Sequence, residues 1–253
     1  MNHTFLRVLI SAFCFSTFGL GGLSIVLAIL PLIHISSFSA ETRKRRIRRT
    51  IQISFYLFVR LMELVTVISV EAAGVEKLRK AKRCILVANH PSLIDIVLLI
   101  AYMPKADCII KSKLLKNPFF GRLVKAAYIP NSEDPDKLLG SCQKSLNSDN
   151  VLVIFPEGTR TPPGQPIKLS RGAANIALRT KHPVLPVHIS CNPPGLLKDE
   201  KWYLLPPRTM KFTLRVDDLI DVEHYLKNGT SINIAARRLT EDIRKLLFPT
   251  ATK

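Results

Sequence analysis

The chain has 253 residues, of which 47% are apolar and 22% charged, a balance typical of a folded protein and not of a disordered tail or a fibrous repeat. It carries 37 Lys and Arg against 19 Asp and Glu, a formal net charge of +18. That surplus predicts an anionic partner: nucleic acid, an acidic membrane surface or a phosphorylated substrate. The five cysteines are widely spaced and never form a C-x-x-C pair, which disfavours a disulfide scaffold or a zinc site and fits a reducing compartment.

The N-terminal region has the composition of a membrane anchor. No Asp, Glu, Lys or Arg occurs between Val8 and Ala40, and Val8–Ile33 is almost continuously apolar. Because roughly 20 helical residues cross a bilayer core, this segment is long enough to do so; whether it spans the bilayer or dips into one leaflet stays open. The competing interpretation is a cleaved secretory signal, since Ser37–Ser39 resembles a cleavage site. The apolar run is longer than the roughly 7–15 residues of a signal core, which favours the anchor.

A basic block, Glu41–Arg49, follows the apolar run. Such a block resists export and is attracted to anionic lipid heads, so we expect the domain behind it on the cytoplasmic face of a membrane, in a bacterium the inner membrane. Ile51–Val70 is a second apolar stretch, in which Arg60 and Glu63 lie three residues apart and share a helical face. It is predicted to form an amphipathic helix at the membrane interface; an ordinary core helix is the alternative.

Beyond Glu71, short β-like runs alternate with helical stretches, which predicts an α/β fold with a mixed, largely parallel sheet flanked by helices. No linker divides the rest of the chain. Residues 1–70 are therefore predicted to hold the anchor, the basic block and the interfacial helix, and residues 71–253 to form one domain. Strands are predicted at Cys84–Ala88, Ala106–Ile110, Val151–Phe155, Val184–Ile189 and Thr209–Val216. Helices are predicted at Leu93–Tyr102, Phe119–Ala127, Pro135–Leu146, Gly172–Arg179 and Ile232–Leu247.

The turn after Cys84–Ala88 carries a candidate catalytic pair, His90 and Asp95. On an uninterrupted helix the two would stand about 140° apart and would not meet. Pro91 disfavours helix at His90 and suits the first helical position, so His90 is expected in the turn, with Asp95 reaching back from the first helical residues. Asp95 would then fix one imidazole tautomer and leave the other nitrogen free to accept a proton. Spacing alone favours the alternative, a capping His beside an unrelated Asp.

A second candidate site is Phe155–Arg160, at the end of the most apolar strand. Ligand groups in α/β proteins gather at the carboxyl ends of strands, where this loop and the His90 turn both lie. Gly158 permits a tight loop, Arg160 can hold a phosphate through two parallel hydrogen bonds, and Arg171 directly precedes a helix start. A solvated turn and water-facing arginines are the alternatives. No nucleophilic-serine, P-loop, dinucleotide-binding or metal-ligand pattern occurs, so neither a metal nor a resident cofactor is predicted.

In combination, the Asn89–Asp95 and Phe155–Arg160 segments resemble the N-H-x4-D and F-P-E-G-T-R motifs of the glycerolipid acyltransferases, typified by bacterial 1-acyl-glycerol-3-phosphate acyltransferases. The likeness extends over roughly residues 75–192. Because both motifs occur in this order behind a membrane segment, the resemblance favours a catalytic His90–Asp95 pair over a capping His beside an unrelated Asp. It also takes in three further segments: Lys111–Gly121, Arg171–Ala177 and Val184–Val187.

The resemblance implies a base-catalysed acyl transfer with no acyl-enzyme. His90 would take the proton from a lysolipid hydroxyl while Asp95 holds His90. The hydroxyl oxygen would attack the thioester of the co-substrate, acyl-CoA or acyl-carrier protein. Val184–Val187 matches the block associated with the acyl side. The motif assigned to the acceptor's phosphate and to shaping the site comprises Glu157, Gly158, Thr159 and Arg160.

One position departs from the family pattern. Asn131 ends the Tyr128–Asn131 block where the family places an Arg, which removes a phosphate ligand worth about 1.5–3 kcal/mol. Lys125, Arg122 or Arg171 would have to compensate. Otherwise the acceptor is not lysophosphatidic acid but another lysolipid, such as a lyso-ornithine lipid.

The positive charge allows two other interpretations. One is a non-catalytic relative that binds anionic lipids in the same cleft. The other is nucleic-acid binding, which is not expected: aromatic residues make up only 7% of the chain and do not alternate with basic ones. Membrane lipids, an acyl donor and a lysolipid acceptor are the predicted partners.

Overall fold

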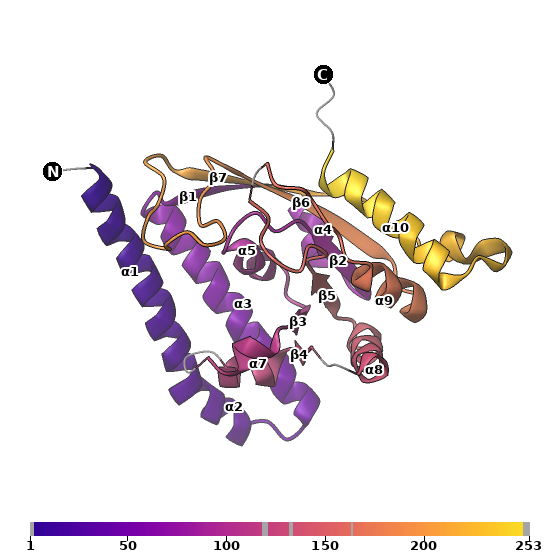
Figure 1. The fold of residues 1–253 in the computed structure, drawn as a ribbon. Helices are drawn as coiled ribbons and strands as arrows, with labels where there is room; N and C mark the ends of the chain where they lie inside the picture. The colour runs from indigo at the N-terminus through magenta and orange to yellow at the C-terminus, as the bar shows by residue number, and fades with distance from the viewer. Residues whose placement is uncertain (1–2, 118–120, 132–133, 163, 250–253) are drawn as a thin grey trace.

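The computed structural model describes residues 3–117, 121–131, 134–162 and 164–249 (Figure 1). Within them, one seven-stranded sheet has the strand order β1–β7–β6–β2–β5–β3–β4. Neighbouring strands pair in parallel except β6 and β7, which are antiparallel. The sheet is thus mixed and largely parallel, as predicted. Its strands are β1 (Ile68–Ala73), β2 (Cys84–Ala88), β3 (Ala106–Ile110), β4 (Ile129–Pro130), β5 (Val151–Ile154), β6 (Val184–Asn192) and β7 (Met210–Val216).

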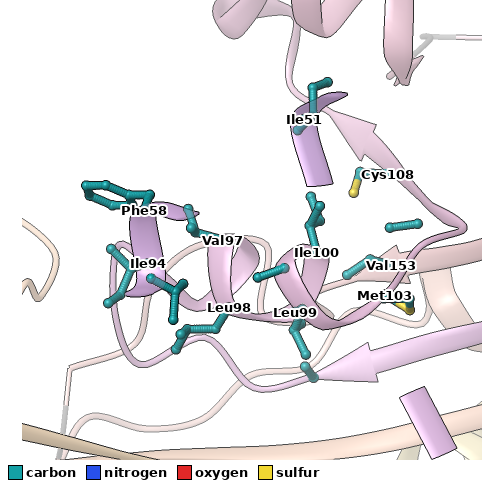
Figure 2. Packing of buried hydrophobic residues seen from close by; sticks show 14 of the residues in the cluster. Ile51, Phe58, Ile94, Val97, Leu98, Leu99, Ile100, Met103, Cys108 and Val153 are labelled. Carbon is teal, nitrogen blue, oxygen red and sulfur yellow. The ribbon is translucent and has the colours of Figure 1, made fainter. Parts of the chain in front are cut away.

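Helices cover both faces of this sheet. The side chains of β2 alternate: Cys84, Leu86 and Ala88 belong to the cluster under α3 and α5, and Ile85 and Val87 to the cluster under α8, α9 and α10. Figure 2 shows the first of these clusters, where residues of α3 and α5 meet Cys108 and Val153 of the sheet. The flanking helices are α3 (Ala40–Leu64), α5 (Asp95–Tyr102), α8 (Pro135–Asn147), α9 (Gly172–Thr180) and α10 (Ile232–Leu247).

Sequence patterns located the central elements closely and missed short ones. The predicted helix at Phe119–Ala127 is observed as α7 (Gly121–Ala127), and its first two residues lie outside the described part of the chain. The pattern gave no indication of the edge strand β4, nor of two short helices, α4 (Val75–Lys80) and α6 (Ser112–Leu115). These elements are too short to show a period. A 3-10 helix, Glu223–Gly229, precedes α10.

The predicted helix at Ile51–Val70 is wrong at its carboxyl end. Helix α3 stops at Leu64, Thr66 adopts a left-handed φ of 57°, and β1 begins at Ile68. The apolar run hid this boundary because both elements are apolar. The run of β-branched residues from Val65 to Ile68 favours extended backbone and could have marked it.

Helix α3 packs as a core helix on one side and is exposed on the other. Ile47, Ile51 and Met62 are buried against the domain. Near its start the buried Arg48 pairs with Asp107 at the beginning of β3, and its Nε donates to the carbonyl of Ala127 at 2.9 Å. The basic block forms the first turns of this helix, which Ser39 caps by accepting the N–H of Thr42.

The N-terminal apolar segment forms one continuous helix: α1 (His3–Ser24), a π-helical turn (Ile25–Ile29) and α2 (Leu30–Ile35). Phe5–Ile35 is long and apolar enough to cross a membrane. The helix lies beside α3 (Figure 1), and Phe18 packs on Phe58 with ring centroids 4.7 Å apart. The predicted anchor is therefore one half of a helical hairpin.

Candidate active site

The two sequence motifs meet because their strands are neighbours. Strands β2 and β5 pair in parallel, with Val87 opposite Ile154. The turn that follows β2 and the loop that follows β5 thus leave the sheet side by side at its carboxyl edge. The Phe155 ring stacks on the His90 imidazole at this point, with centroids 4.2 Å apart.

His90 and Asp95 are in direct contact. The imidazole Nδ1 lies 2.8 Å from Asp95 Oδ2. Asp95 is the first residue of α5, so its carboxylate points back over the turn that holds His90. Ser92 fixes the carboxylate from the same side: its N–H donates to Oδ2 at 2.7 Å and its hydroxyl to Oδ1 at 2.5 Å. The turn that Pro91 introduces does bring the pair together.

Burial gives this pair a defined proton arrangement. The Asp95 side chain is fully buried, and that of His90 is 19% exposed. Burial raises the pKa of Asp95, and the hydrogen bonds from His90 and Ser92 oppose that rise. Because an ionised carboxylate only accepts hydrogen bonds, Nδ1 carries the proton that faces it. Nε2 is left as the acceptor, which is the arrangement a general base requires.

Glu157 holds the backbone of the turn that contains His90. Its Oε1 accepts the N–H of His90 at 2.7 Å, and the His90 carbonyl accepts the N–H of Thr161 at 3.3 Å. The loop after β5 is therefore hydrogen-bonded to both the N–H and the carbonyl of His90. The resemblance attributes acceptor binding to Glu157; in the structure its carboxylate has this positioning task, and a negative group suits a phosphate poorly.

Asn89, which the sequence reasoning did not single out, ties the turn to the strand on its other side. Its Nδ2 donates to the carbonyl of Ile189 at 2.7 Å, and its Oδ1 accepts the Ile189 N–H at 2.6 Å. The side chain thus continues the β2–β6 pairing for one more residue. The only available signal was its place in the motif directly before His90.

The loop after β5 places two cationic groups near the site. Arg160 Nη1 donates to the carbonyls of Leu196 and Leu197 at 3.1 and 2.9 Å. Gly158 adopts a left-handed φ of 69°, and its carbonyl accepts from Lys111 Nζ at 2.6 Å. Lys111 was not among the predicted site residues. Its position directly after β3, at the same carboxyl edge of the sheet, could have indicated it.

The remaining predicted site residues, Thr159, Arg171 and Asn131, are all exposed. Arg171 is exposed at the start of α9, next to Ser170, whose N–H donates to the carbonyl of Pro156 at 2.8 Å. Asn131 is exposed beyond β4, and β5 and β3 separate that edge strand from β2. At about 4.8 Å per strand, Asn131 stands well away from His90.

An apolar cavity of about 470 Å³ lies between the N-terminal hairpin and α7. Its wall is almost entirely hydrocarbon, and it includes glycines of α1 as well as the start of the Lys111–Gly121 region. The described residues hold no group of three or more His, Cys, Asp or Glu that could bind a metal ion. The cavity is lined by Thr17, Phe18, Gly21, Gly22, Ile25, Ile51, Ser54, Phe55, Leu57, Phe58, Leu61, Leu114, Leu123, Val124 and Tyr128.

These features define an α/β protein that carries a hydrogen-bonded His–Asp pair at the carboxyl edge of its sheet and an apolar cavity between its N-terminal hairpin and α7. Residues 69–190 match the family model described as Acyltransferase. The matched segment spans β1 through most of β6 and includes both motifs.

Similar proteins bear related names. The chain is 32% identical over 133 residues to the 1-acyl-sn-glycerol-3-phosphate acyltransferase of Pseudomonas aeruginosa, a match covering 50% of this chain and 51% of the relative. It is 29% identical over 156 residues to the coconut (Cocos nucifera) enzyme of the same name, covering 57% and 51%. It thus spans about half the length of these curated relatives. The fold resembles the crystal structure of the 1-acyl-sn-glycerophosphate acyltransferase PlsC from Thermotoga maritima, with a TM-score of 0.72, 19% identity and 99% of both chains covered.

The Glu157 contact predicts different outcomes for two substitutions. Glu157→Gln keeps an oxygen that can accept the His90 N–H, whereas Glu157→Ala leaves that N–H unpaired at a cost of about 1–3 kcal/mol. We expect the amide of His90 to exchange about tenfold faster or more in Glu157→Ala, and near the wild-type rate in Glu157→Gln. Hydrogen–deuterium exchange of the peptide around His90 measures this. Asp221→Ala is the control, because Asp221 also accepts a backbone N–H, that of Glu223 at 3.1 Å, at an exposed position away from this turn. Wild-type exchange in Glu157→Ala would show that the contact does not hold the turn.

Proposed function

We propose that the chain transfers an acyl group from a thioester donor, acyl-CoA or acyl-carrier protein, to the free hydroxyl of a lysolipid. The observation that carries this proposal is the 2.8 Å contact between His90 Nδ1 and the buried Asp95, which leaves Nε2 as a base. The match to the acyltransferase family model and the names of the relatives support the reaction class and suggest 1-acyl-glycerol-3-phosphate as the acceptor.

The proposed reaction needs one base and no acyl-enzyme. Nε2 of His90 takes the proton from the lysolipid hydroxyl as the oxygen attacks the thioester carbonyl carbon. Asp95 stabilises the imidazolium that forms. Collapse of the tetrahedral intermediate breaks the C–S bond, and the departing thiolate takes the proton from His90. The ester oxygen–carbon bond is made and the free thiol of the carrier is released.

Positive charge near the turn supports an anionic acceptor. Lys111 lies beside the Gly158 carbonyl, and Arg171 is exposed at the start of α9, where helix N–H groups also favour an anion. Together they would supply positive charge for the phosphate of such an acceptor. We therefore propose a phosphate-bearing lysolipid, lysophosphatidic acid or a related lysophospholipid.

We further propose that the N-terminal hairpin lies in one leaflet and does not cross the bilayer. The exposed apolar side chains of α1 recur on one face, at Phe5, Leu9, Phe13 and Leu20. On the opposite face Ser11, Cys14 and Gly22 are buried, so the helix meets protein on that side and is proposed to meet lipid on the other. A helix with this division suits the plane of the interface.

The packing of α3 supports the same placement. The hairpin cannot leave the domain without separating α3 from β3, which would break the buried Arg48–Asp107 pair. Breaking a buried pair costs about 3–5 kcal/mol. Exposed arginines at positions 45, 46 and 49 then meet anionic lipid heads at the start of α3. We propose that, in a bacterium, the domain lies on the cytoplasmic face of the inner membrane.

The base assignment is tested by removing the imidazole. We expect His90→Ala to lower turnover by about 10²–10⁴-fold, the range for loss of a general base. The assay follows labelled acyl groups from acyl-CoA and acyl-carrier protein into a panel of lysolipids. His224→Ala, which removes an exposed imidazole near Tyr225, should leave turnover unchanged. Equal rates for His90→Ala and wild type would refute the mechanism.

We propose that the apolar cavity takes an acyl chain, and a larger side chain at position 21 would shorten the cavity. A Cβ at Gly21 meets nothing within 4 Å, so a leucine side chain there is accommodated and occupies the cavity. We expect Gly21→Leu to shift the preference towards shorter acyl chains by about tenfold, because each methylene that loses its pocket costs about 1–3 kcal/mol. Competition between donors of different chain length measures the ratio. Gly19→Leu is the matched control: its Cβ is equally unobstructed, and Gly19 does not line the cavity. An unchanged ratio in Gly21→Leu would place the chain elsewhere.

The one-leaflet placement fixes the side of the N-terminus. A protease-cleavable tag before Met1 should be protected in intact spheroplasts and cut in inverted vesicles, because both ends of the hairpin lie on the cytoplasmic side. A tag after Lys253 serves as the control for sidedness. Cleavage of the N-terminal tag in spheroplasts would indicate that the helix crosses the bilayer.

A further inference from the structure

The segment between β6 and β7, residues 193–209, connects the catalytic turn with the N-terminal helix. We call it the 193–209 loop. In Figure 1 it is the orange stretch that runs beside α1. It has little regular structure of its own, yet both of its ends are hydrogen-bonded to other parts of the fold. It also contains Trp202, the single tryptophan of the sequence.

One part of the loop is held by the active site. The carbonyl of Leu196 accepts the N–H of Leu93, in the catalytic turn, at 3.0 Å. The same carbonyl accepts from Arg160 Nη1 at 3.1 Å, and that of Leu197 accepts from the same nitrogen at 2.9 Å. The Leu196 side chain is buried. Arg160 therefore positions this backbone, a role that the resemblance does not attribute to it.

The other part of the loop is held by α1. The carbonyl of Trp202 accepts from Ser11 Oγ at 2.8 Å, and the carbonyl of Arg208 accepts from Arg7 Nη2 at 3.1 Å. The Trp202 ring packs on Phe15 with centroids 5.3 Å apart. The loop thus lies directly against the helix proposed to enter the leaflet.

The outer side of the loop has the composition of a membrane interface. Trp202 is 43% exposed and Leu204 is 52% exposed, although both are large and apolar. Lys198 and Lys201 are exposed in the same loop, with the exposed Asp199 and Glu200 between them. Tryptophan with neighbouring lysines is the combination enriched at the level of lipid head groups, where the ring meets the acyl region and the charges meet phosphates. Because Trp202 packs on Phe15, this patch lies beside α1.

We propose that the 193–209 loop is a second bilayer contact, in which Trp202 and Leu204 enter the lipid interface beside α1. The inference rests on the proposed one-leaflet placement of α1. Lipid contact at Trp202 stabilises the loop from outside, and the Leu196 and Leu197 carbonyls transmit that order to Arg160 and to Leu93 in the catalytic turn. The enzyme is then most active when its loop is seated in the membrane that holds the acceptor.

The single tryptophan allows a direct test without any substitution. The full chain is reconstituted into vesicles of phosphatidylcholine and phosphatidylglycerol, and binding is verified by co-sedimentation. We expect the Trp202 emission to shift to shorter wavelength, to lose quenching by acrylamide and to gain quenching by lipids brominated near the head-group end of the acyl chain. Unchanged emission and acrylamide quenching in the co-sedimented protein would overturn the proposal. Trp202→Phe supplies the background signal.

A second measurement tests the coupling to the site. Leu204→Ser should lower turnover of vesicle-embedded acceptor by about tenfold, the effect of roughly 1.4 kcal/mol, and Trp202→Phe should retain most of it. Leu219→Ser is the matched control, since Leu219 is a comparably exposed leucine outside the loop, 57% exposed. Wild-type turnover in Leu204→Ser would remove the coupling. The fluorescence result needs no turnover, so a seated tryptophan in a protein that transfers no acyl group would count against the proposed reaction and not against the loop contact.

Discussion

A carboxylate with no access to water organises the candidate site. Asp95 takes hydrogen bonds from the Ser92 N–H, the Ser92 hydroxyl and His90 Nδ1, so its charge is balanced without solvent. Because the carboxylate is fixed at the first residue of α5, the imidazole has one orientation and one tautomer. Desolvation raises the pKa of Asp95, and the three donors counter that rise. The pKa of Asp95 therefore depends on the geometry of the turn that holds these donors.

The sheet explains why that turn is rigid. Three neighbouring strands, β6, β2 and β5, run in the same direction, and the two outer ones contribute contacts to residues 89–90, which follow β2. Asn89 binds the backbone of β6, Glu157 binds the N–H of His90 from the loop after β5, and Phe155 covers the imidazole face. Catalytic geometry of this kind requires support from outside the reacting pair. Here that support comes from both flanking strands.

The sequence predicted the central strands, the chain order of the helices and the position of the His90–Asp95 pair. It did so because long apolar runs, Pro91 and the two motifs are local signals. It could not show which motif residues face a substrate. Glu157 and Arg160 have charges that suggest ligand binding, yet in the structure they bind backbone atoms of His90, Leu196 and Leu197. Such contacts depend on residues 36 to 67 positions apart in the chain, which no local pattern encodes. Lys111 directly follows a predicted strand, a local signal, but only the order β5–β3 in the sheet brings it to Gly158.

Packing also bears on how the N-terminal segment meets a membrane. By length and composition, Phe5–Ile35 is able to span a membrane, and only its packing can distinguish crossing from lying in one leaflet. One side of that helix meets α3, and α3 is bound to the sheet through a buried ion pair, so the helix and the α/β domain are held together. The 193–209 loop joins this unit to Arg160 through its backbone carbonyls, which accept from Ser11 and from Arg160, while the side chains of Trp202 and Leu204 stay partly exposed. In the proposed function, this arrangement brings an acceptor held in one leaflet to the His90–Asp95 pair at one edge of the sheet.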